Sequence, residues 1–491
     1  MNKTVLYALS FSTNAAILVF EIAGGRLLAP YLGTAVGVWA GLISVVLAGM
    51  ALGYHWGGKV ADTHASKAVV GRFLFASGLA ALIAWSVRDI VPSFFALTGF
   101  SETWGALLVG TVLFMPTVFI LAAISPLLVK NLIKNIEHSA SEVGTLYAVG
   151  SIGSIVGAVG TGMLLIPHFG VSAILLGVAV FLLCASFLLL KDNVVLHTVI
   201  VIVVIALAFF LNALPTRASI AEADITTEYN RVFVDRLEKF GNARSLSMDP
   251  FGTQCAMFVD ADNTADERHI VFRYIQGFDI LRETARPEGA PRALFLGGCN
   301  FSYPRYLLNL FPETTADVVE IDRGMTKIAE TYFGFDTSKF PTLTIFYEDA
   351  RTYLKKPRGK YDIVFMDAFG ASRGIPVHLT TKEMFQSIGE NLKSDGTLFI
   401  NAHGAYEGEG ARFPAALLRT VREVFPYVSV YRLGDEPARN QNLLFAASFE
   451  KEFPDILTDE RFPEITLTET SLPESDIILT DDFAPVERLL N

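Results

Sequence analysis

The fold is decided by four stretches in the second half of the chain: RALFLGGCN (292–300), ADVVEID (316–322), LTIFYEDA (343–350) and YDIVFMDAF (361–369). Each is an apolar, strand-like run that ends in glycine or in acidic residues, and polar segments carrying Pro or Gly separate them. Strands that alternate with helical stretches predict βαβ units and a parallel sheet. Because ligands bind such sheets at the carboxyl ends of the strands, we expect a nucleoside site where these runs end.

Glycine and acidic residues mark the ends of the first three predicted strands. Gly297 and Gly298 follow the first strand, and glycine there lets the backbone approach a ligand closely. Glu320 lies 23 positions after Gly297 with Asp322 beside it, and a carboxylate at that spacing accepts hydrogen bonds from both ribose hydroxyls. The third strand ends in Asp349, which suits an adenine amino group.

The fourth predicted strand ends in Asp367. An acid in so apolar a run is costly unless it is paired or functional, which favours a functional role. The other residues also have structural interpretations: glycines after a strand can form a plain turn, Glu320 can cap a helix, and Asp349 can be a surface carboxylate. His378 and His403 are interpreted as structural rather than catalytic.

Shorter patterns complete an α/β domain. Further strands are expected near 396–402, 428–433 and 443–449, giving seven in all, with helices near 303–310, 381–392 and 409–424. Ahead of the sheet, a small β lid is expected from short antiparallel strands at 230–237, 244–249 and 254–260, followed by a helix around 267–280. The predicted domains are a helical domain at 1–214, a linker and lid at 215–285, and the main α/β domain at 286–491.

The first 214 residues hold the apolar excess of a chain that is 52% hydrophobic with a mean hydropathy of +0.42. A membrane-spanning helix needs about 20 apolar residues, and the candidate spans are 5–24, 34–54, 69–87, 105–129, 143–166, 171–190 and 194–213. The first is not a convincing signal peptide, since no small-residue cleavage site follows it. The sequence therefore predicts a polytopic α-helical membrane domain of about seven helices, in a multi-pass protein of the cell (inner) membrane.

Small residues recur at every fourth position in two of these spans. Gly49, Gly53 and Gly57 form one row, and Gly153 and Gly157 belong to another. Such rows let helix backbones approach closely in lipid, so they predict a tightly packed anchor bundle. A transporter half is the alternative, because the stretch that follows Gly53 resembles the loop between the second and third helices of major-facilitator transporters.

Basic residues predict an orientation that conflicts with the expected ligand. They follow the second, fourth and sixth spans: Lys59, Lys67, Arg72, Lys130, Lys134 and Lys191. The positive-inside rule then places the N-terminus in the cytoplasm and, with seven spans, the C-terminal domain outside. A nucleoside substrate is made inside the cell. Either 194–213 does not cross, or a span is miscounted, or the domain faces outward and is fed through the membrane; the sequence leaves these alternatives open.

Charge and cysteine content argue against some functions. After residue 214 the chain carries 43 Asp+Glu against 30 Lys+Arg, and an acidic surface argues against nucleic acid as a partner. The three cysteines, Cys184, Cys255 and Cys299, form no pattern and predict neither a disulfide framework nor a zinc site. No metal is expected, because no Cys/His cluster has ligand spacing.

At the motifs described above, the chain resembles the spermidine synthase (polyamine aminopropyltransferase) family, a branch of the class I methyltransferase-like, Rossmann-like fold. The resemblance spans roughly 225–450. It is carried by Leu296-Gly297-Gly298, Val319-Glu320-Ile321-Asp322, Glu348-Asp349-Ala350 and the run 361–368. The run from Ile375 to Thr381 and the N-terminal half look like the membrane-fused members of this family.

The resemblance implies roles for residues on the strand ends and on the lid. Binding of substrate is implied for Tyr229, Gln254, Tyr274, Gly297, Gly298, Asn300, Glu320, Asp322, Asp349 and Ala350. Glu320 would hold the ribose and Asp349 the adenine of S-adenosylmethionine or its decarboxylated form. Asp367 would be the catalytic aspartate, orienting or deprotonating the attacking amine, while Gln254 and Tyr274 look like lid residues that line the site.

Three departures from the family pattern bear on the substrate. Asn300 stands where the family's glycine loop carries an Asp that grips the aminopropyl ammonium of decarboxylated S-adenosylmethionine, and Gly370 replaces a second Asp. The late Pro/Tyr segment is not recognisable in 434–445. A polyamine carries several positive charges and needs carboxylates around it, so these losses weaken the case for putrescine. A neutral Asn300 would tolerate the carboxylate of S-adenosylmethionine itself.

Three functions fit these observations. The first is alkyl transfer from a sulfonium nucleoside, releasing 5′-methylthioadenosine, either to a polyamine or to the substrate's own amine or carboxylate in an intramolecular cyclisation. The second is methyl transfer on the same fold, and the third is a non-catalytic membrane transporter or sensor with a nucleoside-binding domain. No tightly bound cofactor is expected. The expected partners are a nucleoside substrate and the lipid bilayer, and a homo-oligomer is left open.

Overall fold

The computed structural model describes residues 1–97, 101–133, 139–190, 193–212, 221–249, 252–285, 290–356, 359–369 and 375–490. The chain divides into two compact units, Met1–Ala221 and Glu222–Asn491. The first six residues of the expected linker, 215–220, lie outside the described residues, as do Lys134, Lys191 and Gly370.

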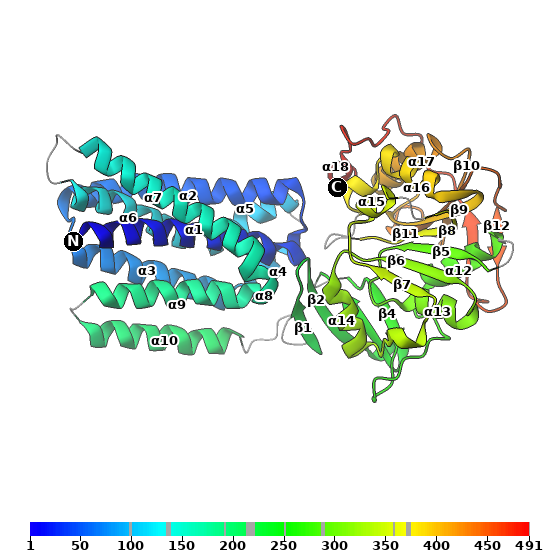
Figure 1. Ribbon diagram of the computed structural model, residues 1–491, viewed down its shortest axis with the longest axis horizontal. Coiled ribbons are helices and arrows are strands. Elements are labelled where there is room, and N and C mark those ends of the chain that lie inside the picture. The colour runs from blue at the N-terminus through cyan, green and yellow to red at the C-terminus, as the bar shows by residue number, and fades with distance from the viewer. Residues whose placement is uncertain are drawn as a thin grey trace. The chain divides into compact units, whose positions relative to one another are not determined.

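The N-terminal unit is a bundle of helices, drawn in blue to green in Figure 1. Their bounds are α1 Lys3–Leu32, α2 Val36–Thr63, α3 Lys67–Ser86, α4 Ile90–Leu97, α5 Glu102–Leu113, α6 Met115–Leu132, α7 Ser139–Gly160, α8 Ile166–His168, α9 Val171–Leu189 and α10 Val194–Asn212. A π-helical turn at Thr161–Leu165 joins α7 to α8. Within the described ranges, seven helical segments are long and apolar enough to cross a membrane. The fourth expected span is divided into α5 and α6 at Phe114, just before Pro116, whose missing N–H interrupts the helical ladder.

Both glycine rows lie where two helices touch. A Cβ on Gly53 of α2 would lie 2.3 Å from the carbonyl oxygen of Phe119 on α6. A Cβ on Gly153 of α7 would lie 2.2 Å from the carbonyl oxygen of Phe11 on α1. No side chain fits at those distances, so glycine is what allows these backbones to pack so closely, as the rows predict.

The lid is a small antiparallel sheet at the beginning of the C-terminal unit. Its described strands pair in the order β1-β2-β3-β4, with bounds β1 Ala223–Thr226, β2 Arg231–Leu237, β3 Ala243–Ser247 and β4 Cys255–Phe258. Strand β1 is an addition to the three strands that the sequence predicts. The sequence does not reveal it because it is short and half-exposed, and only its pairing with β2 defines it. The helix that follows is α12, Arg273–Ala285, which begins later than predicted.

The main sheet has nine strands among the described residues, in the order β12-β13-β10-β11-β9-β8-β5-β6-β7. Their bounds are β5 Arg292–Leu296, β6 Thr315–Val319, β7 Leu343–Phe346, β8 Tyr361–Met366, β9 Leu392–Gly404, β10 Tyr427–Arg432, β11 Gln441–Ser448, β12 Ile456–Thr458 and β13 Thr466–Glu469. Strands β7, β6, β5, β8 and β9 are parallel, and β11 and β10 are antiparallel. The prediction of seven strands is therefore wrong, because it omits the short hairpin β12-β13. That hairpin has too few apolar residues to be recognised as strands from the sequence.

Helices cover both faces of this sheet, as Figure 1 shows. They are α13 Ser302–Leu310, α14 Arg323–Tyr332, α15 Ala350–Leu354, α16 Lys382–Asn391, α17 Arg412–Arg422 and α18 Val486–Leu490. Alternate residues of each strand enter different cores: Leu294 packs with the α15–α17 side, and Phe295 with the α12–α13 side. Burial on both faces explains why these strands are continuous apolar runs.

The strand order also fixes the place of the site. From β5 the chain proceeds to β6 and β7 on one side, and β8 and β9 then lie on the other side. Open α/β sheets bind ligands at such a switch point, outside the carboxyl ends of the strands. Here that point lies between Gly297, which follows β5, and Asp367, which follows β8.

Candidate active site

The loop after β5 presses its backbone against the end of β8. Gly297 has a φ of +104°, and a Cβ there would lie 2.5 Å from the carbonyl oxygen of Asp367. Only glycine combines this backbone conformation with so close an approach. We call residues 297–301 the glycine loop.

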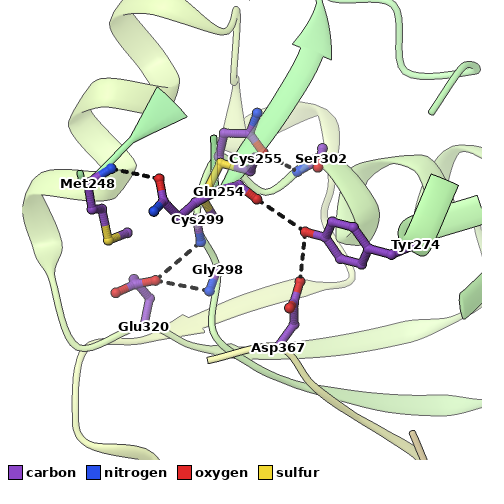
Figure 2. The surroundings of a disulfide bond; sticks show 10 residues. Met248, Gln254, Cys255, Tyr274, Gly298, Cys299, Ser302, Glu320 and Asp367 are labelled. Carbon is purple, nitrogen blue, oxygen red and sulfur yellow. Dashed lines mark hydrogen bonds between the residues drawn. A yellow bond between two sulfur atoms is a disulfide. The ribbon is translucent and has the colours of Figure 1, made fainter. Parts of the chain in front are cut away.

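Glu320 lies beside the glycine loop at the end of β6. Its Oε2 accepts hydrogen bonds from the backbone N–H groups of Gly298 and Cys299, at 2.9 and 3.3 Å (Figure 2). Its Oε1 accepts one from the N–H of Asp322 at 2.9 Å. Burial raises the pKa of Glu320, while these N–H groups oppose the rise. A carboxylate has about four acceptor positions, so Glu320 keeps capacity for a ribose hydroxyl.

Asp349 follows β7 and begins α15. Its Oδ1 accepts a hydrogen bond from the N–H of Thr352 at 2.9 Å, and its Oδ2 lies 3.0 Å from Nε2 of His378. Burial acts to raise the pKa of Asp349, but these two partners hold it below its ordinary value. Asp349 is therefore both a helix cap and an anionic group at the strand ends.

Asp367 follows β8 and has a hydrogen-bond donor on each carboxylate oxygen. Nδ2 of Asn401 donates to Oδ1 at 2.9 Å, and the hydroxyl of Tyr274 donates to Oδ2 at 3.1 Å. Burial raises the pKa of Asp367 to about 6, and the two hydrogen bonds limit the rise. Burial and the neighbouring Asp367 also raise the pKa of Tyr274 well above its usual range, so the phenol remains a donor. A carboxylate with this pKa is suited to accept a proton near neutral pH.

These side chains line one pocket at the carboxyl ends of the parallel strands, which we call the glycine-loop pocket. Of the residues predicted from the sequence, it is lined by Gln254, Tyr274, Gly297, Gly298, Glu320, Asp349, Ala350 and Asp367. The lid supplies Gln254, and the sheet supplies most of the others. The fold therefore brings together residues that are more than 100 positions apart in the chain.

Three predicted residues are placed differently within the described part of the chain. Asn300 is buried and its Oδ1 accepts a hydrogen bond from the backbone N–H two residues on, while its Nδ2 has no hydrogen-bond partner among the described residues. Asp322 is also buried: it caps α14 and accepts a hydrogen bond from the hydroxyl of Thr227 in the lid. Tyr229 is 40% exposed, and its neighbour Asn230 lines the pocket instead.

A second pocket of about 290 Å³ adjoins the first, and Gln254, Tyr274 and Phe369 line both. Its polar lining includes Asp249, Asn401, His403 and Asn442, and we call it the amide pocket. Asn401, which donates a hydrogen bond to Asp367, lines this pocket, whereas Asp367 and Glu320 line the glycine-loop pocket. The two pockets therefore offer separate places for two reacting groups.

Sequence reasoning did not single out Asn401. Its amide is fixed by Asn442, whose Nδ2 donates to Oδ1 of Asn401 at 2.9 Å, so that the Asn401 Nδ2 points to Asp367. The available signal was the position of Asn401 within the run TLFINAHG, a polar residue that directly follows the apolar part of a strand. The same pattern pointed to Asp367.

The expectation that the cysteines form no disulfide is wrong. Cys255 of β4 is bonded to Cys299 of the glycine loop, with their Cα atoms 6.4 Å apart (Figure 2). The two residues are 44 positions apart, so only the lid's position over the loop brings them together. Cys184 is free and exposed on α9.

The fold and the pocket define the C-terminal unit as a Rossmann-like, methyltransferase-fold domain with a β lid. Residues 284–461 match the family model described as the spermine/spermidine synthase domain. A polyamine aminopropyltransferase of Vibrio vulnificus is 30% identical over 238 residues, covering 45% of this chain and 77% of that protein. The chain belongs to the spermine/spermidine synthase family.

One further curated relative and two solved structures are also similar to the chain. A probable polyamine aminopropyl transferase of Bifidobacterium longum is 27% identical over 234 residues, or 43% of this chain and 51% of that protein. Among solved structures, a probable spermidine synthase from Corynebacterium glutamicum is 20% identical with a TM-score of 0.39, covering 46% of this chain and 79% of that one. Spermidine synthase from Thermotoga maritima is 19% identical with a TM-score of 0.36, covering 47% and 72%.

Proposed function

We propose that the protein transfers an aminopropyl-type alkyl group from a sulfonium nucleoside, S-adenosylmethionine or its decarboxylated form, and releases 5′-methylthioadenosine. The observation that carries this proposal is the setting of Asp367, which lines the glycine-loop pocket and is hydrogen-bonded to Asn401 and Tyr274, two residues that line the adjoining amide pocket. Membership of a family whose relatives are named polyamine aminopropyltransferases supports the reaction class. The glycine-loop pocket would hold the nucleoside and the amide pocket the acceptor.

In this mechanism the nucleoside is positioned by the strand ends. Glu320 would accept hydrogen bonds from the ribose, and Asp349 from the adenine amino group. The sulfonium is an intrinsically good leaving group, so the protein mainly aligns the nucleophile with the carbon that it attacks. The C–S bond breaks as the N–C bond forms, and the sulfur leaves as the neutral thioether of methylthioadenosine.

Asp367 would hold the attacking amine and accept its proton. Asn401 and Tyr274 each donate to one oxygen of the carboxylate, so each oxygen keeps a lone pair that can accept a further hydrogen bond in the glycine-loop pocket. Because the pKa of Asp367 is about 6, it is ionised above that pH and can accept first a hydrogen bond and then a proton from the ammonium form of the acceptor. Loss of that proton makes the amine lone pair available for displacement.

A second version of the reaction is an intramolecular cyclisation of S-adenosylmethionine. The supporting observation is Asn300, a neutral residue whose buried Nδ2 has no partner within the described chain. A neutral amide does not repel the carboxylate that S-adenosylmethionine retains, whereas an aspartate at that position would. This version needs no separate acceptor in the amide pocket.

Mass spectrometry of the products tests these proposals. Detergent-purified protein would be incubated with S-adenosylmethionine or its decarboxylated form, each with and without putrescine. Methylthioadenosine formed only from the decarboxylated donor with putrescine would establish intermolecular aminopropyl transfer. Methylthioadenosine from S-adenosylmethionine alone would support the cyclisation, and S-adenosylhomocysteine would indicate methyl transfer instead. Absence of any nucleoside product would contradict the enzymatic proposal and favour transport or sensing.

We also propose that the N-terminal unit spans a membrane. Seven helical segments of its described residues have the necessary length and apolar character. The side chains of α10 support this proposal, because apolar residues such as Val195, Phe209 and Phe210 are more than 60% exposed. Large apolar surfaces of this kind are costly in water and favourable in lipid. Recovery of the full-length protein in the membrane fraction after an alkaline carbonate wash would support the proposal, and recovery in the supernatant would contradict it.

A further inference from the structure

The disulfide joins the lid to the part of the main domain that faces the nucleoside. Cys255 begins β4, the edge strand of the lid, and directly follows Gln254, which lines both pockets. Cys299 directly follows Gly298 and lies in the glycine loop. Both cysteines line the glycine-loop pocket, as Figure 2 illustrates with Glu320 and Asp367 nearby.

The glycine loop has a backbone conformation that needs support. Cys299 and Phe301 have φ values of 47° and 59°, in the left-handed region that residues with a side chain rarely adopt. Each such residue costs on the order of 1 kcal/mol or more unless its surroundings hold it. Glu320 holds the N–H of Cys299 at 3.3 Å, and the disulfide holds its side chain.

The rest of the lid is attached to a different part of the domain. Apolar lid residues, among them Met257, pack with Ile328 and Phe333 of the α14 region. Arg244 of β3 donates a hydrogen bond to the carbonyl oxygen of Tyr332 at 2.7 Å. Cys255 belongs to the same apolar cluster and Cys299 packs against it, but the packing of Met257 on the α14 region and the hydrogen bond of Arg244 do not need the covalent bond. We therefore expect the lid to stay docked when the disulfide is broken. What the disulfide adds is a link at the pocket, between β4 and the glycine loop.

We propose that Cys255 and Cys299 are positioning residues whose disulfide sets the glycine loop for nucleoside binding. With the bond intact, the N–H groups of Gly298 and Cys299 stay aligned with Glu320, the residue proposed to hold the ribose. With the bond reduced, the loop is free to leave its left-handed conformation, and the nucleoside binds less tightly. This inference rests on the proposed nucleoside site.

The disulfide also implies that the glycine-loop pocket is fully formed only in an oxidising compartment. A dithiol reductant opens it by exchange: the reductant's two thiols become a disulfide, and Cys255 and Cys299 gain two electrons and two protons to become thiols. Disulfides persist outside the cytosol and are reduced within it. If all seven candidate spans cross the membrane, the positive-inside rule applied to the basic residues predicts the same side for the C-terminal unit. The pocket would therefore be fully formed on the oxidising side of the membrane.

The test measures binding of 5′-methylthioadenosine to the full-length, detergent-purified protein by calorimetry, before and after treatment with dithiothreitol. Alkylation and mass spectrometry would report the state of each cysteine. We expect reduction to raise the Kd by about tenfold or more, and reoxidation to restore it. Cys255→Ser/Cys299→Ser should bind like the reduced protein and be insensitive to the reductant. Cys184→Ser, which changes the free cysteine of α9, is the matched control and should behave like the wild type.

A kinetic measurement separates positioning from general support of the fold. In the reduced enzyme we expect the KM for the donor to rise by about tenfold, with kcat at saturating donor changed by less than about threefold. Equal Kd values for the oxidised and reduced protein, with both thiols shown to be free in the latter, would overturn the proposal. So would finding both cysteines as thiols in the protein isolated under non-reducing conditions.

Failure of the nucleoside site itself would be distinguishable. If the oxidised protein bound no methylthioadenosine, the proposed function would be contradicted, and hydrogen exchange would then decide the role of the disulfide. We expect amide exchange at residues 297–302 to accelerate by about tenfold on reduction, while exchange in α14 stays unchanged. Unchanged exchange in the glycine loop would overturn the positioning role.

Discussion

Asn401 donates a hydrogen bond of 2.9 Å from its Nδ2 to Oδ1 of Asp367. The two residues come from neighbouring parallel strands, β9 and β8, and Asn442 of β11 fixes the orientation of the Asn401 amide. This hydrogen bond favours the ionised carboxylate, whereas burial favours the protonated one. The balance between them gives Asp367 a pKa of about 6.

The first prediction concerns the dependence of activity on pH. Because the proposed mechanism needs the unprotonated form of Asp367, we expect kcat/KM to be constant above pH 7 and to fall about tenfold per pH unit below about 6. Asn401→Ala removes a hydrogen bond that lowers the pKa, so the acidic limb should move to higher pH. A hydrogen bond to a charged group is worth about 1.5–3 kcal/mol, and one pKa unit is about 1.4 kcal/mol, so we expect a shift of about one to two units. An unchanged limb in this variant would show that Asp367 is not the group that titrates.

The second prediction separates binding from chemistry at Asp367. Asp367→Asn keeps the shape of the side chain but removes its charge and its basicity. We expect turnover to fall by roughly 10²- to 10⁴-fold, while the Kd for methylthioadenosine measured by calorimetry stays near the wild-type value. Wild-type turnover in this variant would refute the catalytic role. A parallel loss of binding would instead show that Asp367 serves mainly to shape the pocket.

Much of the site could be predicted from the sequence because its residues obey a local rule. Buried parallel strands are continuous apolar runs, and the residue that ends each run lies at the binding edge of the sheet. Glu320, Asp349 and Asp367 all follow this rule, and all three line the glycine-loop pocket. Asp322 also ends such a run, but its carboxylate caps α14, which the sequence pattern does not distinguish from binding.

The features that sequence reasoning missed depend on contacts between distant segments. Asn401 gains its role only because the strand order places β9 beside β8. The disulfide requires the lid to lie over the glycine loop, and nothing within either segment indicates that placement. Strands β1, β12 and β13 are short and partly exposed, and pairing with a neighbour rather than an apolar pattern defines them.

The third prediction tests the close approach of the glycine loop to β8. Gly297→Ala would place a Cβ 2.5 Å from the carbonyl oxygen of Asp367, in a backbone conformation with positive φ. We expect activity to be lost by at least about 100-fold, because displacing Asp367 by even about 1 Å misaligns the reacting groups. Gly241→Ala is the matched control: its φ is +67°, but a Cβ there meets nothing within 4 Å. The control should cost only stability, on the order of 1–3 kcal/mol for a residue with a side chain in this sparsely populated conformation, and equal activity losses in both variants would attribute the effect to backbone strain alone.

The fourth prediction concerns the packing of α1 against α7. Gly153→Ala would place a Cβ 2.2 Å from the carbonyl oxygen of Phe11, so the two helices would have to separate. We expect a lower apparent Tm for the detergent-purified protein, because close backbone contact is a main source of helix association in lipid. Gly160→Ala, on the same helix but with nothing within 4 Å of its Cβ, should leave the Tm unchanged. Equal thermal unfolding of the two variants would contradict a role for the glycine row in packing.

The last prediction is the side of the membrane on which the C-terminal unit lies. With seven spans and basic residues after the even-numbered ones, the positive-inside rule predicts that residues 222–491 lie outside the cytoplasm. Alkaline phosphatase, which needs disulfides to fold, should be active when fused after the C-terminus, and a fluorescent protein that requires the cytoplasm should be dark there. Fusion after His64, which follows α2, should give the reverse pattern.

The same cells should contain Cys255 and Cys299 as a disulfide when thiols are trapped before lysis. A cytoplasmic reporter signal at the C-terminus together with free thiols would show that one candidate span, most simply α10, does not cross. The combination also bears on the substrate: an outward-facing site must receive a nucleoside that is made inside the cell.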